Sequence, residues 1–387
     1  MFHKVMTLAL AVLGLTLNVS AIASNAGAVY AMTNAADGNE IVIYGRASDG
    51  ELTLAGQVAT GGLGSGGDAP LEPVDALGAQ SPLILSKNQR FLLAVNAGSD
   101  EISVFRVKKD RLVLVDKVSS GGDFPVSLTL NRDLLYVLNS GGDGNITGFK
   151  LSPSGRLTPI AGSTRSLDVD GASPPFFLVS PAQVGFSPSG DVLVVTIKGT
   201  NEIRVFSVDE DGVPSSQPET STSNGTTPFS FVFSRRGDLI VVEAFGTGVV
   251  GDPNAGAASS YDIAPEGGLE VISGSVGNSQ TATCWIVASP GGRFAYTTNN
   301  ASNTISGYRI GRDGRLSLLD LNGVTAITGD APVDIAITPN GRFLYNVNAF
   351  TGTVSAFRVN KADGSLTALG EIGGLPIDDG AVGIAAR

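Results

Sequence analysis

Seven segments of the 387-residue chain follow one pattern, and this repeat restricts the fold more than any other feature. In each segment a strand of aliphatic and aromatic residues, usually ending near Asn, precedes a turn of Gly, Asp or Asn. A second strand with an aromatic residue near its end, another turn and a third strand complete the segment. A further short strand precedes most segments. The segments begin at Val29, Phe91, Leu134, Val192, Leu239, Phe294 and Phe343.

Each unit is therefore predicted to be a four-stranded antiparallel sheet. Apolar stretches of a few residues, rich in Val, Ile, Leu, Phe and Thr, are typical of half-buried or buried strands. Asp-Gly, Ser-Gly and Asn-Gly pairs supply the positive φ angles that tight hairpins require. Seven such sheets predict an all-β fold, a seven-bladed β-propeller with four antiparallel strands per blade.

The two ends of the repeat predict how the ring closes. The first segment, at Val29, lacks its inner strand, whereas the C-terminal residues 380–387 resemble an inner strand that nothing follows. We expect these residues to supply the inner strand of the first blade, because otherwise each end would leave an unpaired sheet edge. A β-helix or a string of sandwiches is the alternative, and neither accounts for this arrangement.

Loop lengths indicate which face carries a site. Connections on one face are long: residues 61–80, 163–180, 214–227, 246–258 and 323–331. We call this the long-loop face and the opposite one, with mostly short turns, the short-turn face. A ligand site is expected at the mouth of the central channel on the long-loop face. The alternative is that these loops are merely tolerated at the surface.

The N-terminus has the features of an export signal. Lys4 precedes a largely apolar run, Met6 to Val19, that is too short to cross a bilayer, and small residues follow at Ala21 and Ala23. We expect residues 1–23 to be a signal peptide, residues 24–387 to form a single seven-bladed propeller, and the protein to be secreted or periplasmic. An uncleaved membrane anchor is the alternative.

Charge and rare residues exclude several classes of function. Removing Lys4 with the signal changes the formal charge from −11 to −12. This balance, without a Lys/Arg cluster in the chain, argues against nucleic acid or an anionic membrane as partner, and we expect a monomer that binds a small molecule.

The sole histidine, His3, lies in the signal, so a base or acid would be a carboxylate, lysine or tyrosine. Without a histidine partner Cys284 is not expected to act as a nucleophile.

Repeat units such as DIAITPNGRFLYNVNAFTGTVSAFRVNKADGSLTALG resemble the seven-bladed lactonase propellers, the family that includes bacterial 6-phosphogluconolactonase and fungal carboxymuconate-lactonising enzyme. The resemblance covers residues 29–387, and TTPFSFVFSRRGDLIVVEAFG and TATCWIVASPGGRFAYTTN resemble an exported branch. It implies the propeller fold and a lactonase. Family members use histidine, arginine and glutamate at the channel mouth, and no histidine role can be transferred to this chain. Two hypotheses follow: an exported lactone hydrolase, or a non-catalytic propeller that binds a protein, sugar or small ligand on its long-loop face.

Three residues are candidates for catalysis. Glu243 ends the second strand of blade 5, resembles the family glutamate of that blade, and is a candidate base for activating water, with loop hydrogen bonding as the alternative. By sequence register it lies one residue before the Asn positions of the other blades. Lys198 is a candidate to bind substrate charge or an oxyanion. Arg204 occupies a column of small residues and is expected either to meet a carboxylate or to pack its stem between blades.

Further candidates are ligand-binding or metal-binding residues. Asparagines recur at one position of the repeat, either as a polar ring at the channel mouth or, the favoured interpretation, as caps of the following turn: Asn34, Asn96, Asn139, Asn299 and Asn348. Trp285 is expected either to stack on a ligand or to fill the core between blades. We expect no cofactor, since zinc ligands are lacking; Asp330, Asp334, Asp378 and Asp379 are the best candidates for a calcium site, and scattered turn-forming Asp is the favoured alternative.

Overall fold

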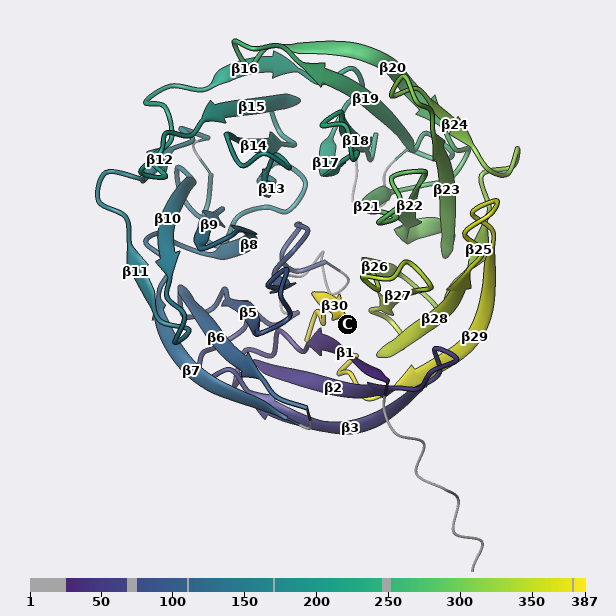
Figure 1. Ribbon diagram of the computed structural model, residues 1–387, viewed down its shortest axis with the longest axis horizontal. Coiled ribbons are helices and arrows are strands. Elements are labelled where there is room, and N and C mark those ends of the chain that lie inside the picture. Colours follow the sequence, from purple (N-terminus) through teal and green to yellow (C-terminus); the bar gives the residue numbers. More distant parts are fainter. Residues whose placement is uncertain (1–25, 68–74, 110, 170, 246–251, 378) are drawn as a thin grey trace, which may run out of the picture.

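The computed structural model describes residues 26–67, 75–109, 111–169, 171–245, 252–377 and 379–387. These residues form seven sheets arranged as a ring (Figure 1). Each sheet has four antiparallel strands, and two sheets carry one additional short strand. The predicted all-β, seven-bladed propeller is thus confirmed. The expected signal peptide lies outside the described residues. Within them the only helix is the three-residue η1 (Asn300–Ser302), and no helix is long and apolar enough to cross a membrane.

Each of the first four blades has four main strands, in the following order from the axis outward. Blade 1 contains β30 (Ile384–Ala386), β1 (Gly27–Met32), β2 (Glu40–Arg46) and β3 (Leu52–Ala59). Blade 2 contains β4 (Leu83–Leu85), β5 (Phe91–Asn96), β6 (Glu101–Val107) and β7 (Leu112–Ser119). Blade 3 contains β8 (Pro125–Asn131), β9 (Leu134–Asn139), β10 (Asn145–Leu151) and β11 (Leu157–Pro159), with β12 (Arg165–Ser166) also paired to β10. Blade 4 contains β13 (Pro181–Phe186), β14 (Val192–Ile197), β15 (Glu202–Ser207) and β16 (Glu219–Thr222).

The remaining three blades follow the same order. Blade 5 contains β17 (Pro228–Phe233), β18 (Leu239–Glu243), β19 (Ala257–Ile263) and β20 (Leu269–Gly277). Blade 6 contains β21 (Thr283–Ala288), β22 (Phe294–Asn299), β23 (Thr304–Ile310) and β24 (Leu316–Leu318), with β25 (Ala326–Ile327) also paired to β23. Blade 7 contains β26 (Pro332–Ile337), β27 (Phe343–Asn348), β28 (Thr353–Val359) and β29 (Leu366–Gly373).

The ring closes as the sequence predicts. The C-terminal β30 pairs antiparallel with β1, with Tyr30 opposite Ala385 and Ala31 opposite Ile384. The backbone N–H of Arg387 donates to the carbonyl oxygen of Ala28 at 2.9 Å, which extends the pairing by one residue. The two ends of the propeller therefore share one sheet, and in Figure 1 the yellow β30 lies beside the purple β1.

The hydrophobic core lies between neighbouring blades. Every residue of β5, β22 and β27 is buried, whereas the outermost strands β3 and β29 are largely exposed. Tyrosines of second strands tie one blade to the next. Tyr345 donates its hydroxyl to the carbonyl oxygen of Gly50, in the next blade round the ring, at 2.9 Å. Gly50 has a φ of 103°, and a side chain there would overlap the ring of Phe343, so this turn requires glycine.

Candidate functional site

A segment of the first long loop fills the long-loop end of the central channel. After β3 the chain runs into the middle of the ring (Figure 1), and we call residues 75–80 the central segment. The backbone N–H of Gln80 donates to Ala182 of blade 4 at 3.1 Å. Its side-chain amide exchanges two hydrogen bonds of 2.8 Å with the backbone of Ile286 in blade 6. Leu77 and Ala79 are fully buried. The segment thus links two inner strands across the axis.

Lys198 and Trp285 donate hydrogen bonds to the backbone of the central segment. Lys198 follows β14 and donates from Nζ to the carbonyl oxygen of Gly78. The indole N–H of Trp285, on β21, donates to the carbonyl oxygen of Ala79 at 3.0 Å. Both side chains contact Phe229: Lys198 Nζ lies 4.7 Å from the ring centroid, and the Trp285 ring meets it edge-on at 5.0 Å. Trp285 therefore packs in the core between blades, as one of its two predicted alternatives stated.

Two buried carboxyl groups accompany Lys198 in the channel. Burial raises the pKa of Asp75 to about 7, although the Lys198 ammonium and the N–H of Gly78, 2.9 Å from Oδ1, act in the opposite direction. Burial likewise raises the pKa of Asp334 to about 7, and the negative charge of Asp75 adds to this rise. We call Asp75, Lys198 and Asp334 the channel cluster. It combines a cation with two groups that change charge near neutral pH.

Asp334 also secures the ring closure. It lies at a bulge in β26, where Oδ1 accepts the N–H of Ile335 at 2.9 Å. Oδ2 accepts the N–H of Ile384 at 3.2 Å, so the side chain connects blade 7 to the inner strand of blade 1. Of the expected calcium ligands, Asp330 is exposed and bonded to Asn303, and Asp378 lies outside the described residues. Among the residues described, no three His, Cys, Asp or Glu side chains gather as a metal site.

Strand pairing corrects the predicted register of Glu243. Glu243 lies opposite Ala257, just as Asn299 lies opposite Thr304 in blade 6. It therefore occupies the Asn position itself, and the prediction that it precedes this position by one residue is wrong. The cause is Asp238, a polar residue at the position that Phe294 occupies in blade 6, which makes the apolar pattern of blade 5 begin one residue late.

The Glu243 carboxylate is enclosed within blade 5. Oε1 accepts hydrogen bonds from the backbone N–H of Gly225 at 2.9 Å and the hydroxyl of Ser259 at 2.5 Å. Oε2 accepts the hydroxyl of Ser275 at 2.7 Å. Burial raises the pKa of Glu243, whereas these donors lower it. The partners come from the outer strands and the preceding loop, so Glu243 and Lys198 lie in different surroundings.

Arg204 lies on β15, third from the axis, and bonds locally. Nε and Nη2 donate to the carboxylate of Glu202 at 3.0 and 2.7 Å, and Nη1 donates to the carbonyl oxygen of Leu167. The expected carboxylate partner therefore exists within the same strand. Because Leu167 belongs to the long loop that precedes blade 4, Arg204 attaches that loop to the outer half of the blade.

The recurrent asparagines are buried, and we call their shared position the latch position because those of blades 2, 3 and 6 also bond to the preceding blade. Asn96 donates to Ser103 at 2.8 Å and accepts Thr60 and Asn39 of the preceding blade at 2.7 and 3.1 Å. Asn299 and Asn348 donate to serines at the same position, Ser306 and Ser355, at 2.8 Å. Asn139 donates to Asn145 and to a backbone oxygen of the preceding blade. These four side chains are fully buried, and the hydrogen bonds named here engage the following strand or the preceding blade; a polar ring that binds a ligand stays a prediction.

Asn34 departs from this pattern. Thr33 takes the latch position of blade 1, because its backbone N–H bonds to Glu40 across the strand pair. Asn34 follows in a left-handed conformation, with a φ of 55°. Its side chain exchanges hydrogen bonds with Ser65 at 2.9 and 3.1 Å and donates to the carbonyl oxygen of Gly380 at 3.4 Å. It thereby joins the first long loop to the C-terminal segment.

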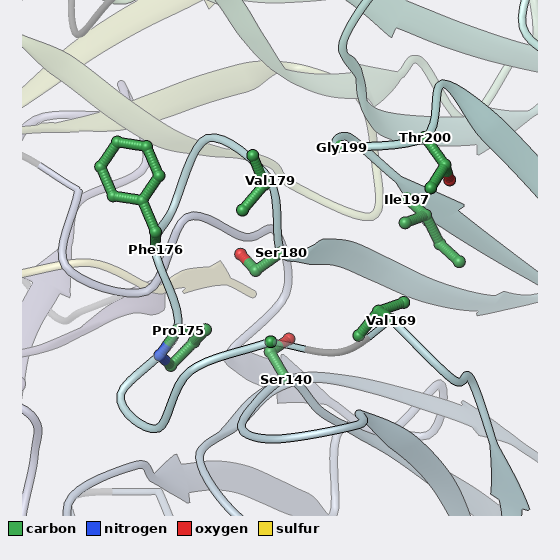
Figure 2. Close-up of a pocket in the computed structure, with 10 residues that line it drawn as sticks. Ser140, Val169, Pro175, Phe176, Val179, Ser180, Ile197, Gly199 and Thr200 are labelled. Atoms are coloured by element: carbon green, nitrogen blue, oxygen red, sulfur yellow. The ribbon is translucent and has the colours of Figure 1, made fainter.

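An open pocket lies between the long loops of blades 3 and 4. It has a volume of about 220 Å³, and Figure 2 shows Ser140 and Val169 facing Ile197 and Thr200 across it. Phe176 and Val179 border the pocket and remain 41% and 49% exposed, which is unusual for large apolar side chains. None of the described residues that line it is charged. The pocket suits a small, mainly apolar group.

Sequence reasoning missed Asp75 and Gln80. The loop that contains them is predicted to be a long loop of the functional face, but no residue in it stands out. DALGAQ matches no motif, and it has no counterpart in the other repeats with which it could be compared. The burial of Asp75 follows only from the position of its loop inside the ring, which the sequence does not show.

Comparison with protein families gives one match. The family described as "Lactonase, 7-bladed beta-propeller" matches residues 69–166, 164–247 and 256–375. No curated protein matches the chain.

Solved structures share the fold at low sequence identity. A Bacteroides fragilis protein provisionally assigned as a 6-phosphogluconolactonase is 19% identical, with a TM-score of 0.69 over 94% of this chain and 99% of that one. A Lactobacillus plantarum protein is 19% identical, with a TM-score of 0.71 over 93% and 99%. The periplasmic gluconolactonase of Pseudomonas aeruginosa is 16% identical, with a TM-score of 0.68 over 93% and 98%. At these identities the likeness establishes the fold.

Proposed function

Because the chain belongs to the family of seven-bladed β-propeller lactonases, we propose that it hydrolyses a small lactone at the long-loop end of its channel. The observation that carries this proposal is the channel cluster. Asp75 and Lys198 interact electrostatically inside the ring, and the pKa of Asp75 is raised to about 7. A base whose pKa lies near the working pH is suited to remove a proton from water.

The proposed reaction uses the two side chains in sequence. The Asp75 carboxylate takes a proton from a water molecule as that water attacks the lactone carbonyl carbon. The Lys198 ammonium stabilises the negative charge that develops on the carbonyl oxygen. Collapse of this intermediate breaks the bond to the ring oxygen, which receives the proton from Asp75, and the product is an open hydroxy acid. Because residues 75–80 cover the cluster, substrate must displace part of this segment to reach it.

Glu243 remains the alternative base. Its pKa is also raised by burial, but it already accepts three hydrogen bonds inside blade 5. In this alternative Lys198 and Arg204 bind substrate charge. The enclosed position of Glu243 favours Asp75.

A second candidate function is binding without catalysis. Two observations favour it: the central segment fills the channel, and the open pocket beside Phe176 and Val179 is apolar. In this case the long-loop face would hold a small apolar ligand or partner between blades 3 and 4.

The test is an assay of lactone hydrolysis with purified protein and a panel of aldonolactones and muconolactones. We expect turnover that falls by about 10²–10⁴-fold in Asp75→Asn. Asp168→Asn, an exposed acid of the same face, serves as the matched control and keeps full turnover. Equal turnover of Asp75→Asn and the control would remove Asp75 from the mechanism, and loss confined to a folded Glu243→Gln variant would assign the base to Glu243.

The same samples test the binding alternative. Trp285 is the only tryptophan and contacts the central segment, so its fluorescence reports ligands that disturb this segment. No turnover of any lactone, together with saturable binding, would favour the non-catalytic function.

We also propose that the protein is exported to the periplasm or the exterior. The basic and apolar N-terminal residues 1–23 support this, as does the likeness in fold to a periplasmic gluconolactonase. The mass of the protein isolated from its host tests it: we expect a chain that begins at Ser24. A full-length chain in the cytoplasmic fraction would contradict the proposal.

A further inference from the structure

The propeller collects its positive charges on the short-turn face. In blades 2 to 7 the turn between the first and second strands lies on this face, close to the axis; blade 1 has no such turn, because its first strand is the C-terminal β30. Exposed cations lie in these turns: Lys87, Arg90, Arg132, Arg235, Arg236, Arg293 and Arg342. In the sequence they are separated by tens of residues, and only ring closure places them around one opening.

A second, outer set of cations lies on the same face, in the turns between the third and fourth strands. Hydrogen bonds connect inner cations to the backbone of the outer turns. Arg90 donates to the carbonyl oxygen of Pro153 in the neighbouring blade at 3.3 Å, and Arg293 donates to that of Lys361 at 3.2 Å. Arg156, Arg312 and Arg315 are exposed in the outer turns. The cations thus cover a broad surface and do not form a single pocket.

Acidic residues lie on this face as well, and blade 4 carries the largest group of them. Asp191 lies in its inner turn, and Asp209, Glu210 and Asp211 lie in its outer turn. The pKa of Asp191 is lowered by the hydroxyls of Ser189 and Ser187, so this group stays ionised. Exposed acids also occur in the turns of other blades, namely Asp49, Glu51, Asp133, Glu266, Asp313 and Asp363. The outer turns are therefore mixed in charge, whereas in the inner turns the exposed cations outnumber the exposed acids, Asp133 and Asp191.

Apolar side chains are distributed differently. The large, exposed apolar residues of the described chain lie on outermost strands or on the long-loop side, among them Leu63, Phe176, Val179 and Phe350. None lies in the turns of the short-turn face. Protein interfaces usually have an apolar or aromatic centre, so this face is not suited to a protein partner. A partner must be held by charge alone.

We propose that the short-turn face docks the protein onto an anionic phospholipid bilayer. A wide set of exposed cations on the flat end of a ring matches a plane of phosphate headgroups, and each Lys or Arg near such a surface adds to binding. The formal charge of −11 does not by itself oppose this, because exposed cations outnumber exposed acids in the inner turns that would meet the membrane, and charges farther away than about a Debye length are screened. Docking in this orientation leaves the long-loop face, with the channel cluster, open to solution, and it does not depend on lactone chemistry.

The test is sedimentation of the protein with vesicles that contain phosphatidylcholine alone or with about one third phosphatidylglycerol. We expect binding to the anionic vesicles only, lost in 0.5 M salt, where screening extends over roughly 4 Å. Each cation near the surface is expected to raise the partition coefficient onto anionic vesicles on the order of fivefold. The double variant Lys87→Gln, Arg132→Gln should therefore bind about 25-fold more weakly.

The matched control is Lys117→Glu, which changes the net charge by the same −2. Lys117 lies on β7, away from these turns, where it is paired with Glu101. Binding of the control should stay within about twofold of the unmodified protein. Equal weakening by both variants, or sedimentation that does not distinguish the two vesicle types, would overturn the proposal. Tighter binding to a DNA duplex than to anionic vesicles would overturn it as well and would identify nucleic acid as the partner.

Discussion

Ser259 donates a hydrogen bond of 2.5 Å to Glu243 in the same relative position in which Asn299 donates to Ser306. Blade 5 thus keeps the latch of the other blades with a carboxylate in place of an amide. Since a carboxylate only accepts hydrogen bonds, the serine becomes the donor. The same carboxylate accepts the N–H of Gly225, which anchors the loop leading into the blade.

Removing this carboxylate should destabilise the fold. Glu243→Ala leaves the N–H of Gly225 and two hydroxyls without their acceptor, and we expect a loss of about 2–4 kcal/mol in the free energy of unfolding. Glu243→Gln keeps one acceptor oxygen and should lose about 1 kcal/mol. Urea unfolding followed by circular dichroism measures both values. Equal stability of the two variants would show that the hydrogen bonds of Glu243 do not support the blade.

Ring closure predicts a strong effect of proline in the last strand. Ala385 lies opposite Tyr30, and proline there removes a backbone donor within a short inner strand. We expect Ala385→Pro to lower stability by about 3 kcal/mol or more and to promote aggregation through the exposed edge of β1. Thermal unfolding and size-exclusion chromatography measure these effects.

Ser48→Pro is the matched control for that substitution. Ser48 is exposed at the second position of the turn closed by the N–H of Gly50 and the carbonyl oxygen of Ala47, a position that favours proline. Its stability should stay within about 0.5 kcal/mol of the unmodified protein. If Ala385→Pro behaved like this control, the last strand would contribute little to closure.

Cys284 should be inert in the folded protein. It is 8% exposed at the start of an inner strand, and burial raises the pKa of its thiol, with the negative charge of Asp75 adding to the rise. Thiol reagents react with the thiolate, so labelling at pH 8 should be at least about 100-fold slower in the native state than in urea. Mass spectrometry of the labelled chain measures both rates. Fast native labelling would contradict the burial of this residue.

Repetition explains how much of this architecture was predictable. The apolar pattern recurs in every blade, so strand number, blade number and closure by residues 380–387 all follow from it. Register failed where a blade breaks the pattern: Asp238 starts blade 5 with a polar residue, and Ala28, a small residue, takes the equivalent position in blade 1. As a result, the predicted positions of two candidates, Glu243 and Asn34, are each wrong by one residue relative to the recurrent Asn position.

Features without a repeat were not predictable. The central segment occurs once, so no sister sequence shows that Asp75 and Gln80 enter the channel. The cationic face was missed for the opposite reason. Its arginines and lysines recur in the turns, but they are so far apart in the chain that no local cluster appears, and only the ring brings Lys87 and Arg342 to one surface.

The channel cluster predicts how stability depends on pH. Asp334 has a pKa of about 7 when folded and about 3.9 in an unfolded chain, so the folded state holds its proton more tightly. Stability from this group is complete below pH 4 and declines as pH rises to 7, by up to about 4 kcal/mol. Asp334→Asn cannot ionise but loses the bond to Ile384. Urea unfolding should therefore find the variant less stable than the unmodified protein at pH 5, and this difference should shrink or reverse at pH 8. A constant difference would show that Asp334 is already ionised at pH 5.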